Sequence, residues 1–339
     1  MGKTIKDVAL LAGVSTATVS RVLAPENTGP VAEKTRRSVI AATKELGYRT
    51  NFTARSLKLH STMTVAVVFP ELANDFFMDV AEGIERELHA EGYSMLLSSS
   101  LNSLEEEKRR INMLADRMVD GMLIIPTNSR GEHLQELSDQ GMPMVLVDRV
   151  LAGTRLDAVT SDNEEGTLCL TNALLADGFR QIAFVGGDIM LSSARERISG
   201  YVRAMLEAGI KPEPSWIRLG GMKWEDGYRQ MEKLLKRRNH PEAMVAVNLL
   251  VHLGMERCLL DMNSKPSVVI AGFDESRYTP FLPACRYIAS QNAVGMGSKA
   301  GKRIIEKIRE KKTLNQEERT GERIARLPVT ISRPIHRTT

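Results

Sequence analysis

The sequence has few cysteines and no long apolar run. Its three cysteines, Cys169, Cys258 and Cys285, are far apart and show no Cys-x-x-Cys spacing. This argues against a disulfide framework and against a zinc site. No stretch of about 18 apolar residues occurs, so we expect no segment that crosses a bilayer. The first residues enter a capped helix pattern directly and lack the apolar core of a secretory signal. We therefore expect a cytoplasmic protein.

The motifs of common enzyme classes are also missing. There is no GxGxxG after a predicted strand, no GK[ST] phosphate loop and no HExxH pair. The six histidines show neither a triad pattern nor metal-ligand spacing. We therefore expect no catalytic residue, no cofactor, no metal and no enzyme activity.

Charge is unevenly distributed along the chain. The 339 residues, 42% hydrophobic and 26% charged, have the composition of a soluble protein of two or three domains. Residues 1–60 contain ten basic and four acidic side chains, a net +6, whereas the remainder has a net charge of −2. A basic head on a nearly neutral body is typical of a chain that brings one end to a polyanion.

The head has the pattern of a helix-turn-helix. Thr4 is a suitable cap for a helix with an apolar face that includes Ile5 and Val8. Gly13 supplies the chain reversal, and Ser15 can cap a second helix over 16–23. In this motif the second helix enters the DNA major groove and presents its N-terminal side chains to base edges.

The outward side chains of the second helix are suited to DNA. Arg21 can bind a guanine bidentately, Ala17 can pack on a thymine methyl, and Thr16 can make either kind of contact. Thr18 and Ser20 are better suited to phosphates. The alternative, a solvated helix face, accounts for any one of these residues but poorly for the whole set.

A third helix is predicted over about 33–46, with Val39, Ile40 and Leu46 in a small core. The segment 48–58 that follows has few apolar positions. An isolated helix of that length is marginal in water, so a helix there would need a partner.

The body, from Thr64 onward, alternates short apolar runs with helical stretches, which predicts parallel sheets covered by helices. The predicted strands are TVAVVF, SMLLSS, GMLIIP, MVLVD, DAVTS, IAFVG, MVAV, VVIAGF and YIAS. The predicted helices cover 76–91, 104–117, 163–177, 194–209, 225–237 and 293–311. Two α/β lobes facing each other across a cleft suit a body of this size, with the ligand at the carboxyl ends of the strands.

The string TIKDVALLAGVSTATVSRVL, followed by VAEKTRRSVIAATKELGY and N-F-T-A-R-S-L, closely resembles the lac repressor/galactose repressor family of bacterial transcription regulators. The resemblance continues to about residue 333. It implies an all-α helix-turn-helix head at 1–50, a hinge helix and linker at 51–61, and a two-lobed body like a periplasmic binding protein at 62–339. Its N-lobe would comprise about 62–161 and 291–322, its C-lobe about 162–290 and 323–339, with three chain crossings between them.

The pattern and the resemblance together predict the residues that contact DNA. They are Thr4, Ser15, Thr16, Ala17, Thr18, Ser20, Arg21, Thr35, Tyr48, Asn51, Ala54 and Leu57. The last three match the family's hinge helix, in which the leucine wedges between base pairs in the minor groove. For Leu57 the alternative is an ordinary helix anchor.

The resemblance also implies an effector site. Its predicted members are Phe76, Asp148, Arg197, Trp224, Asn248, Asp274 and Gln291. Arg197, Asp274 and Asn248 have the donors and acceptors to clamp adjacent hydroxyls, with Phe76 or Trp224 against the apolar face of the ligand. The alternative is that Arg197 and Asp274 form a structural ion pair.

The expected function is that of a repressor that binds a near-palindromic operator as a homodimer under control of a small effector. The effector class stays open among sugar, sugar phosphate, sugar acid and nucleoside. A transport-type sugar-binding protein and an enzyme are the competing hypotheses. The basic head counts against the first, and the missing motifs count against the second.

Overall fold

The structure is a computed structural model that divides the chain into two compact units, Met1–Thr62 and Met63–Thr339. It describes residues 3–23, 31–48, 61–262, 267–313 and 323–334. Most of the predicted hinge, 51–61, lies outside the described residues.

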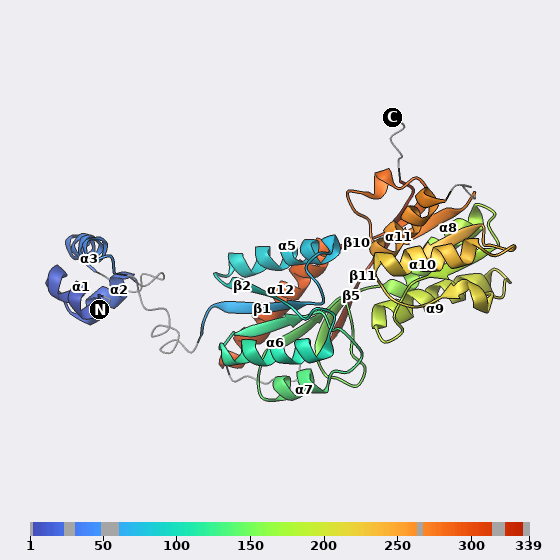
Figure 1. The fold of residues 1–339 in the computed structure, drawn as a ribbon. Coiled ribbons are helices and arrows are strands. Elements are labelled where there is room, and N and C mark those ends of the chain that lie inside the picture. The colour runs from blue at the N-terminus through green and yellow to red at the C-terminus, as the bar shows by residue number, and fades with distance from the viewer. Residues whose placement is uncertain (1–2, 24–30, 49–60, 263–266, 314–322, 335–339) are drawn as a thin grey trace. The chain divides into compact units, whose positions relative to one another are not determined.

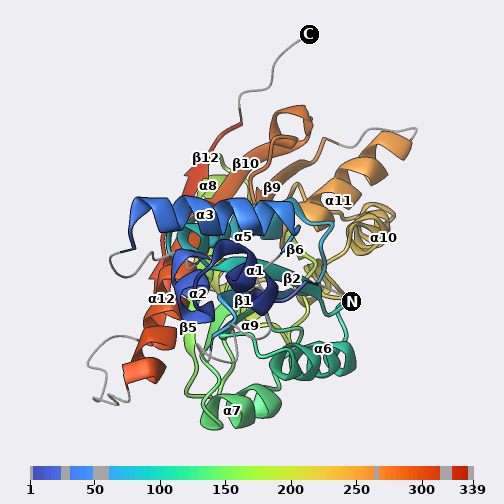
Figure 2. The same cartoon turned by 90° about the vertical axis from the view of Figure 1, so that its left-hand side faces the viewer.

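The first unit contains three described helices, α1 (Ile5–Ala12), α2 (Thr16–Leu23) and α3 (Glu33–Glu45). Each contributes a fully buried valine to one small core, namely Val8, Val19 and Val39. Figure 2 shows α3 lying across α1 and α2. The predicted helix-turn-helix is therefore confirmed as a packed unit with its own core.

Polar caps fix the ends of the first two helices. The backbone N–H and the hydroxyl of Thr4 donate to Asp7 at 2.7 and 2.9 Å, which lowers the pKa of that carboxyl. Gly13 ends α1 in the left-handed region, at φ +67°. The Ser15 hydroxyl accepts a hydrogen bond from the Thr18 N–H at 3.1 Å and so caps α2. These contacts define where α1 begins and ends and where α2 begins.

One prediction about this core is wrong. Ile40 is 52% exposed rather than buried. It follows Val39, which occupies the buried side of α3, and successive residues of a helix are about 100° apart. Two neighbouring residues of a short helix therefore rarely face the same core.

The second unit contains two six-stranded sheets. The strands of the first sheet are β1 (Thr64–Phe69), β2 (Ser94–Ser99), β3 (Gly121–Ile124), β4 (Met144–Val147), β5 (Asp157–Ser161) and β11 (Ile324–Leu327). They are all parallel and run in the order β11-β5-β4-β3-β1-β2. Strand order reverses between β1 and β3, which is where ligands bind in open α/β sheets.

The second sheet repeats this order. Its strands are β6 (Ile182–Val185), β7 (Ile217–Arg218), β8 (Ala243–Ala246), β9 (Val269–Phe273), β10 (Cys285–Gln291) and β12 (Val329–Ser332). They run in the order β12-β10-β9-β8-β6-β7, and only the edge strand β12 is antiparallel. The predicted α/β body of two parallel sheets is thus confirmed.

Helices cover both faces of the first sheet. They are α5 (Asp75–Ala90), α6 (Leu104–Asp116), α7 (Glu132–Asp139) and α12 (Ala293–Thr313). Figure 1 shows α5 and α12 on one face and α6 and α7 on the other. Successive side chains of β1 enter opposite cores, with Val65 packed among α5 and α12 and Ala66 packed among α6 and α7.

The second sheet packs against two helix pairs. The pairs are α8 (Asn163–Ala176) with α9 (Ser192–Glu207), and α10 (Trp224–Leu235) with α11 (Leu249–Asp261). Two short 3₁₀ turns, Pro214–Trp216 and Thr279–Phe281, complete the described elements of this lobe.

The chain crosses between the lobes three times, after β5, after β10 and between β11 and β12. The prediction that residues 323–339 belong to the C-lobe is wrong for Ile324–Leu327, which pair with β5 in the first sheet. The crossing comes at Pro328, where the missing N–H stops a continuous ladder.

Glycines allow the covering helices to touch. A Cβ atom on Gly83 of α5 would lie 2.1 Å from the Val294 carbonyl oxygen, and one on Gly297 of α12 would lie 2.0 Å from the Val80 oxygen. The helix pairs of the second sheet are in equally close contact. Gly200 of α9 lies against the backbone of α8, and Gly254 of α11 lies against the backbone of α10. Backbone contact of this kind leaves no room for any side chain.

We expect Gly297→Ala to destabilise the second unit by about 3 kcal/mol, because the new methyl meets a backbone oxygen that can yield only by separating α5 from α12. Urea denaturation measures the change. Lys299→Ala, an exposed position on the same helix, is the control and should change stability by less than about 0.5 kcal/mol. Equal stability of the two variants would show that the helices are not in backbone contact.

Candidate functional sites

The outward face of α2 has the predicted arrangement. Thr16, Ala17, Ser20 and Arg21 are exposed, and Thr18 is half-buried with its hydroxyl 3.0 Å from that of Ser15. Val19 and Val22 face the core. One side of α2 is therefore anchored, while the other presents short hydroxyls, a methyl group and a guanidinium to the exterior. Their contact with bases stays a prediction.

The other residues predicted to contact DNA differ in their surroundings. Thr4 and Ser15 are exposed, but the Thr4 hydroxyl already donates to Asp7 and the Ser15 hydroxyl already caps α2. Thr35 and Tyr48 are half-buried. The predicted hinge residues lie outside the described part of the chain; they are Asn51, Ala54 and Leu57.

A cavity of about 200 Å³ lies between the two lobes of the second unit, at the carboxyl ends of both sheets. Residues that follow β1, β3 and β4 form one wall, and residues that follow β6, β8 and β9 form the other. All but one of the predicted effector residues line it; they are Phe76, Asp148, Arg197, Asn248, Asp274 and Gln291. The identical strand order of the two lobes explains why these loops converge.

Arg197 is the most extensively bonded side chain of the cavity. It is 3% exposed, and its Nε and NH1 donate to the Asn163 side chain and the Val247 carbonyl, each at 2.8 Å. Its guanidinium lies 3.7 Å from the ring centroid of Phe273 and 3.9 Å from an Asp274 oxygen. Arg197 therefore has a structural role as well as a place in the cavity wall.

Asp274 follows β9 in the left-handed region, at φ +73°, and is 9% exposed. One of its oxygens accepts a hydrogen bond from the amide nitrogen of Gln291, at the end of β10. The Gln291 carbonyl oxygen is buried and has no partner. These two side chains thus leave acceptors for a ligand.

Asn248 has a largely structural role. Its side-chain oxygen accepts from the Val251 N–H at 2.9 Å and caps α11, and its nitrogen donates to the Met222 carbonyl at 3.0 Å. The amide retains one proton and one lone pair for a ligand.

Trp224 does not line the cavity and is 49% exposed, so the structure does not bring it together with the other predicted effector residues, and its stacking role stays a prediction. A Cβ atom added to Gly254 would lie only 1.9 Å from the carbonyl oxygen of Trp224. The start of α10 is thus pressed against α11, and Met222 and Lys223, which precede Trp224, line the cavity instead.

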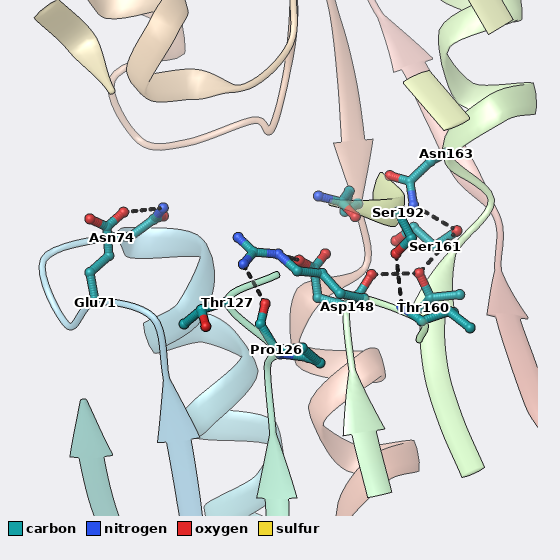
Figure 3. Close-up of polar contacts among 12 residues, drawn as sticks. Glu71, Asn74, Pro126, Thr127, Asp148, Thr160, Ser161, Asn163 and Ser192 are labelled. Atoms are coloured by element: carbon teal, nitrogen blue, oxygen red, sulfur yellow. Dashed lines mark hydrogen bonds and ion pairs between the residues drawn. The ribbon is translucent and has the colours of Figure 1, made fainter. Parts of the chain in front are cut away.

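Asp148 follows β4 with φ +64°. The Thr160 hydroxyl donates a 2.7 Å hydrogen bond to the backbone carbonyl of Asp148 and holds this conformation (Figure 3). The residue is 4% exposed, and one of its side-chain oxygens has no hydrogen-bond partner. The other lies 3.4 Å from Nε of Arg149. Burial raises the pKa of this carboxyl against the opposing effect of Arg149. A buried acceptor without a hydrogen-bond partner therefore lies in the cavity wall.

Two family models match the chain. Residues 4–51 match the model of bacterial regulatory proteins of the lacI family, and residues 62–331 match that of periplasmic binding proteins and the sugar binding domain of the LacI family. The chain belongs to the LacI family of bacterial regulatory proteins. The predicted resemblance is confirmed, and with it the class of transcription regulator.

Several relatives of this LacI-family chain are similar over nearly its whole length. The HTH-type transcriptional regulator RegA of Clostridium saccharobutylicum is 34% identical over 320 residues, 93% of this chain and 95% of RegA. The HTH-type transcriptional repressor PurR of Pasteurella multocida (strain Pm70) is 30% identical over 311 residues, 91% and 92% of the two chains. The lac repressor dimer bound to operator and the anti-inducer ONPF shares the fold, with a TM-score of 0.85 at 24% identity and 98% coverage of both chains.

Neither a membrane-spanning helix nor a cluster of metal ligands occurs in the described part of this LacI-family chain. Within the residues that the structure describes, no helix is long and apolar enough to cross a membrane. Over the same residues, no three His, Cys, Asp or Glu side chains gather in a way that could hold a metal ion.

Three residues in or next to the cavity wall are absent from the predicted site. Arg149 directly follows the predicted Asp148, lines the cavity and donates to the Pro126 carbonyl at 2.6 Å. Asn163 does not line the cavity, but it is fully buried and orients Arg197. Thr127 follows β3 after a buried run and carries an unpartnered hydroxyl. Its only signal in the sequence was its place at the end of a strand.

We expect Arg197→Ala to destabilise the second unit by about 3 kcal/mol, because it leaves Asp274 and Asn163 buried without their cationic partner. Urea denaturation measures this. Arg195→Ala, at an exposed position of α9 two residues before Arg197, is the matched control and should cost about 0.5 kcal/mol or less. A fully stable Arg197→Ala variant would mean that the guanidinium serves the ligand alone.

Proposed function

We propose that this chain is a cytoplasmic repressor that binds a near-palindromic operator as a homodimer through α2, and that a sugar or sugar derivative in the interlobe cavity changes its affinity for that operator. The observation that carries the proposal is the exposed face of α2, with Thr16, Ala17 and Arg21 on one side of a helix whose other side is anchored in a core. A helix-turn-helix reads the major groove with this face.

The relatives support each half of the proposal. PurR is named a repressor, and the lac repressor, which shares the fold, is described as a dimer on its operator. The family model that covers the body is that of a sugar binding domain. Two-fold symmetry of a dimer requires a near-palindromic site, because each copy presents the same helix to one half of it.

The cavity is positioned to couple ligand binding to the angle between the lobes. Its walls come from both lobes, and the backbone N–H of Val150 in one donates to the Ser192 hydroxyl in the other at 2.8 Å. A second link joins Arg326 of β11 to Glu196 of α9 at 2.9 Å. A ligand that favours one lobe angle must change operator affinity if the DNA-bound form favours another, and DNA must change ligand affinity reciprocally.

The predicted hinge residues Asn51, Ala54 and Leu57 keep their place in this proposal. We assign Leu57 to a minor-groove step at the centre of the operator. We further propose that the cavity binds its ligand without converting it. Incubation with candidate sugars, followed by analysis for products, tests this.

We expect Arg21→Ala to remove the preference for operator over scrambled DNA, a loss of about 1–3 kcal/mol, while salt-sensitive nonspecific binding remains. Gel-shift titrations on both duplexes measure it. Arg37→Ala removes an exposed cation of α3 that pairs with Glu33, and it should weaken binding to both duplexes alike. An unchanged operator preference in Arg21→Ala would rule out base reading by this residue.

We expect Asp274→Asn to retain operator binding but to weaken the effector response at least about tenfold, because a charged acceptor of hydroxyl groups becomes a neutral amide. The measurement is a gel-shift titration with a sugar that changes the operator affinity of the parent chain. Glu275→Gln is the control, since Glu275 is the next residue, is exposed and does not line the cavity. An identical response in both variants would contradict the assignment of Asp274.

A further inference from the structure

One peptide group beside the cavity connects two buried charged side chains. The Pro126 carbonyl accepts a hydrogen bond from the Arg149 guanidinium at 2.6 Å (Figure 3). The N–H of the same peptide group belongs to Thr127 and donates to the Glu107 carboxylate at 2.7 Å. Arg149 is 7% exposed and Glu107 1%. Arg149 and Thr127 line the cavity, whereas Glu107, on α6, does not. A residue outside the wall is thus linked to a residue of the wall through a single peptide.

The planarity of that peptide gives the link a direction. A trans peptide holds its N–H and its C=O in one plane, on opposite sides of the C–N bond, and none of the described peptide bonds is cis. When the Glu107 carboxylate fixes the N–H of Thr127, the Pro126 carbonyl must point to the opposite side. The Arg149 guanidinium lies on that side. Glu107 therefore sets the direction of the acceptor that Arg149 uses.

Arg149 depends strongly on this acceptor. Within the described part of the chain, its guanidinium makes one hydrogen bond, to the Pro126 carbonyl, and its Nε lies 3.4 Å from an Asp148 oxygen without a hydrogen bond. Arg197, in the opposite wall, makes two hydrogen bonds of 2.8 Å. A long side chain has many rotamers to choose from once its acceptor is displaced. The place of Arg149 in the wall is therefore as well defined as the Pro126 carbonyl is.

Glu107 is itself held by a third element. Its second oxygen lies 3.0 Å from Nε2 of His133, near the start of α7. Both oxygens of the buried carboxylate thus have partners, as a buried charge requires. Because α6 and α7 cover the same face of the first sheet (Figure 1), the carboxylate joins both helices to the segment that follows β3. Such an arrangement supports a binding wall from behind.

We propose that Glu107 is a positioning residue of the effector cavity, which orients the guanidinium of Arg149 through the Pro126–Thr127 peptide. The inference rests on the binding of the effector in this cavity, as proposed above. It assigns part of the ligand affinity to a side chain that lies outside the cavity. The competing role is purely structural, in which Glu107 only fastens α6 and α7 to the sheet. In that case its loss lowers stability but leaves the affinity of the folded protein unchanged.

Amide hydrogen exchange tests the first step without any ligand. Glu107→Ala removes the acceptor of the Thr127 N–H, so this amide should exchange at least about tenfold faster in the full-length protein. Mass spectrometry of peptides across 125–131 measures the rate. Glu107→Gln should keep the protection of the parent, because its amide oxygen can still accept from Thr127 while its nitrogen donates to the neutral His133 ring. Unchanged exchange in Glu107→Ala would overturn the inference.

Ligand affinity tests the second step. Glucose, galactose and ribose, each with its terminal phosphate and its aldonic acid, are screened on the parent protein by thermal shift. Isothermal titration then gives the dissociation constant of the member that binds most tightly. Glu107→Ala should weaken this affinity about tenfold or more, the equivalent of one hydrogen bond to a charged group. Glu107→Gln should restore it to within about threefold of the parent.

Two results of the titration contradict the positioning role. Equal affinities of the parent and Glu107→Ala would show that the cavity does not depend on this carboxylate. A loss of the same size in Glu107→Ala and Glu107→Gln would assign the effect to charge instead of orientation. If Glu107→Ala does not fold, Glu107→Asp takes its place, because its shorter side chain withdraws the carboxylate from the Thr127 N–H, and the same losses are expected.

Two control variants separate orientation from stability. Gly297→Ala should destabilise the second unit at the contact of α12 with α5, where neither Gly297 nor the atoms that it meets line the cavity, so its affinity should equal that of the parent. Glu105→Ala removes an exposed acid of α6 and should change neither exchange nor affinity. If Gly297→Ala weakens binding as much as Glu107→Ala does, affinity merely follows stability and the inference is wrong.

The proposed function fails in a different way. If no member of the panel binds to the parent protein, the assignment of a sugar or sugar derivative as the effector loses its support. The exchange rates of Glu107→Ala and Glu107→Gln still decide whether Glu107 holds the Pro126–Thr127 peptide, because that measurement needs no ligand.

Discussion

The guanidinium of Arg197 joins three parts of the second unit that are distant in sequence. It binds Asn163 at the first chain crossing, the end of β8 through Val247, and the acidic loop after β9 through Asp274. A buried cation is costly unless its donors are satisfied, and each of these contacts lowers that cost. The geometry of the cavity wall is therefore tied to the geometry of the lobe crossing.

This connection extends across the lobes. The amide of Asn163, held by Arg197, donates to Glu196 at 3.2 Å, and Glu196 pairs with Arg326 on the other lobe. A ligand that shifts the Arg197 side chain must also shift the partners of Asn163, because buried polar groups are seldom left unpaired. The network gives a physical route by which occupancy of the cavity can bias the lobe angle.

The two lobes place equivalent residues at equivalent points. β4 and β9 hold the same position in their sheets, and each is followed by a buried aspartate with positive φ, Asp148 and Asp274. A non-glycine residue in that region is mildly strained, and such strain concentrates at functional sites. The left-handed turn directs both carboxylates over the carboxyl edges of their sheets, where the cavity lies.

Much of the fold could be predicted from the sequence, because the spacing and order of apolar runs indicate which segments are buried. The nine predicted strands are all present, since buried parallel strands are continuous apolar runs. The missed elements give weaker signals. β7 has two residues, and β11 and β12 are half-exposed edge strands. The helix α7 has only eight residues, and α11 is so extensively buried that it lacks a clear polar face.

The site was harder to predict than the fold, because side-chain contacts depend on neighbours that sequence does not reveal. Trp224 has the chemistry to stack on a sugar, yet the contact of its backbone with Gly254 fixes it against α11. Arg149 directly follows the predicted Asp148, but its place in the wall depends on the turn at Asp148. The sequence therefore identified the loop, and only the structure identified the side chain.

The division of charge constrains how an effector can act on DNA binding. The excess of basic residues lies in residues 1–60, and the head has its own core and caps. The nonspecific attraction of each head for phosphate is therefore independent of the cavity. In a dimer, the two heads bind jointly only when their spacing matches the half-sites, and joint binding raises affinity by effective concentration. On the proposed function, the effector must act on that spacing, so it should change operator affinity strongly and nonspecific affinity very little.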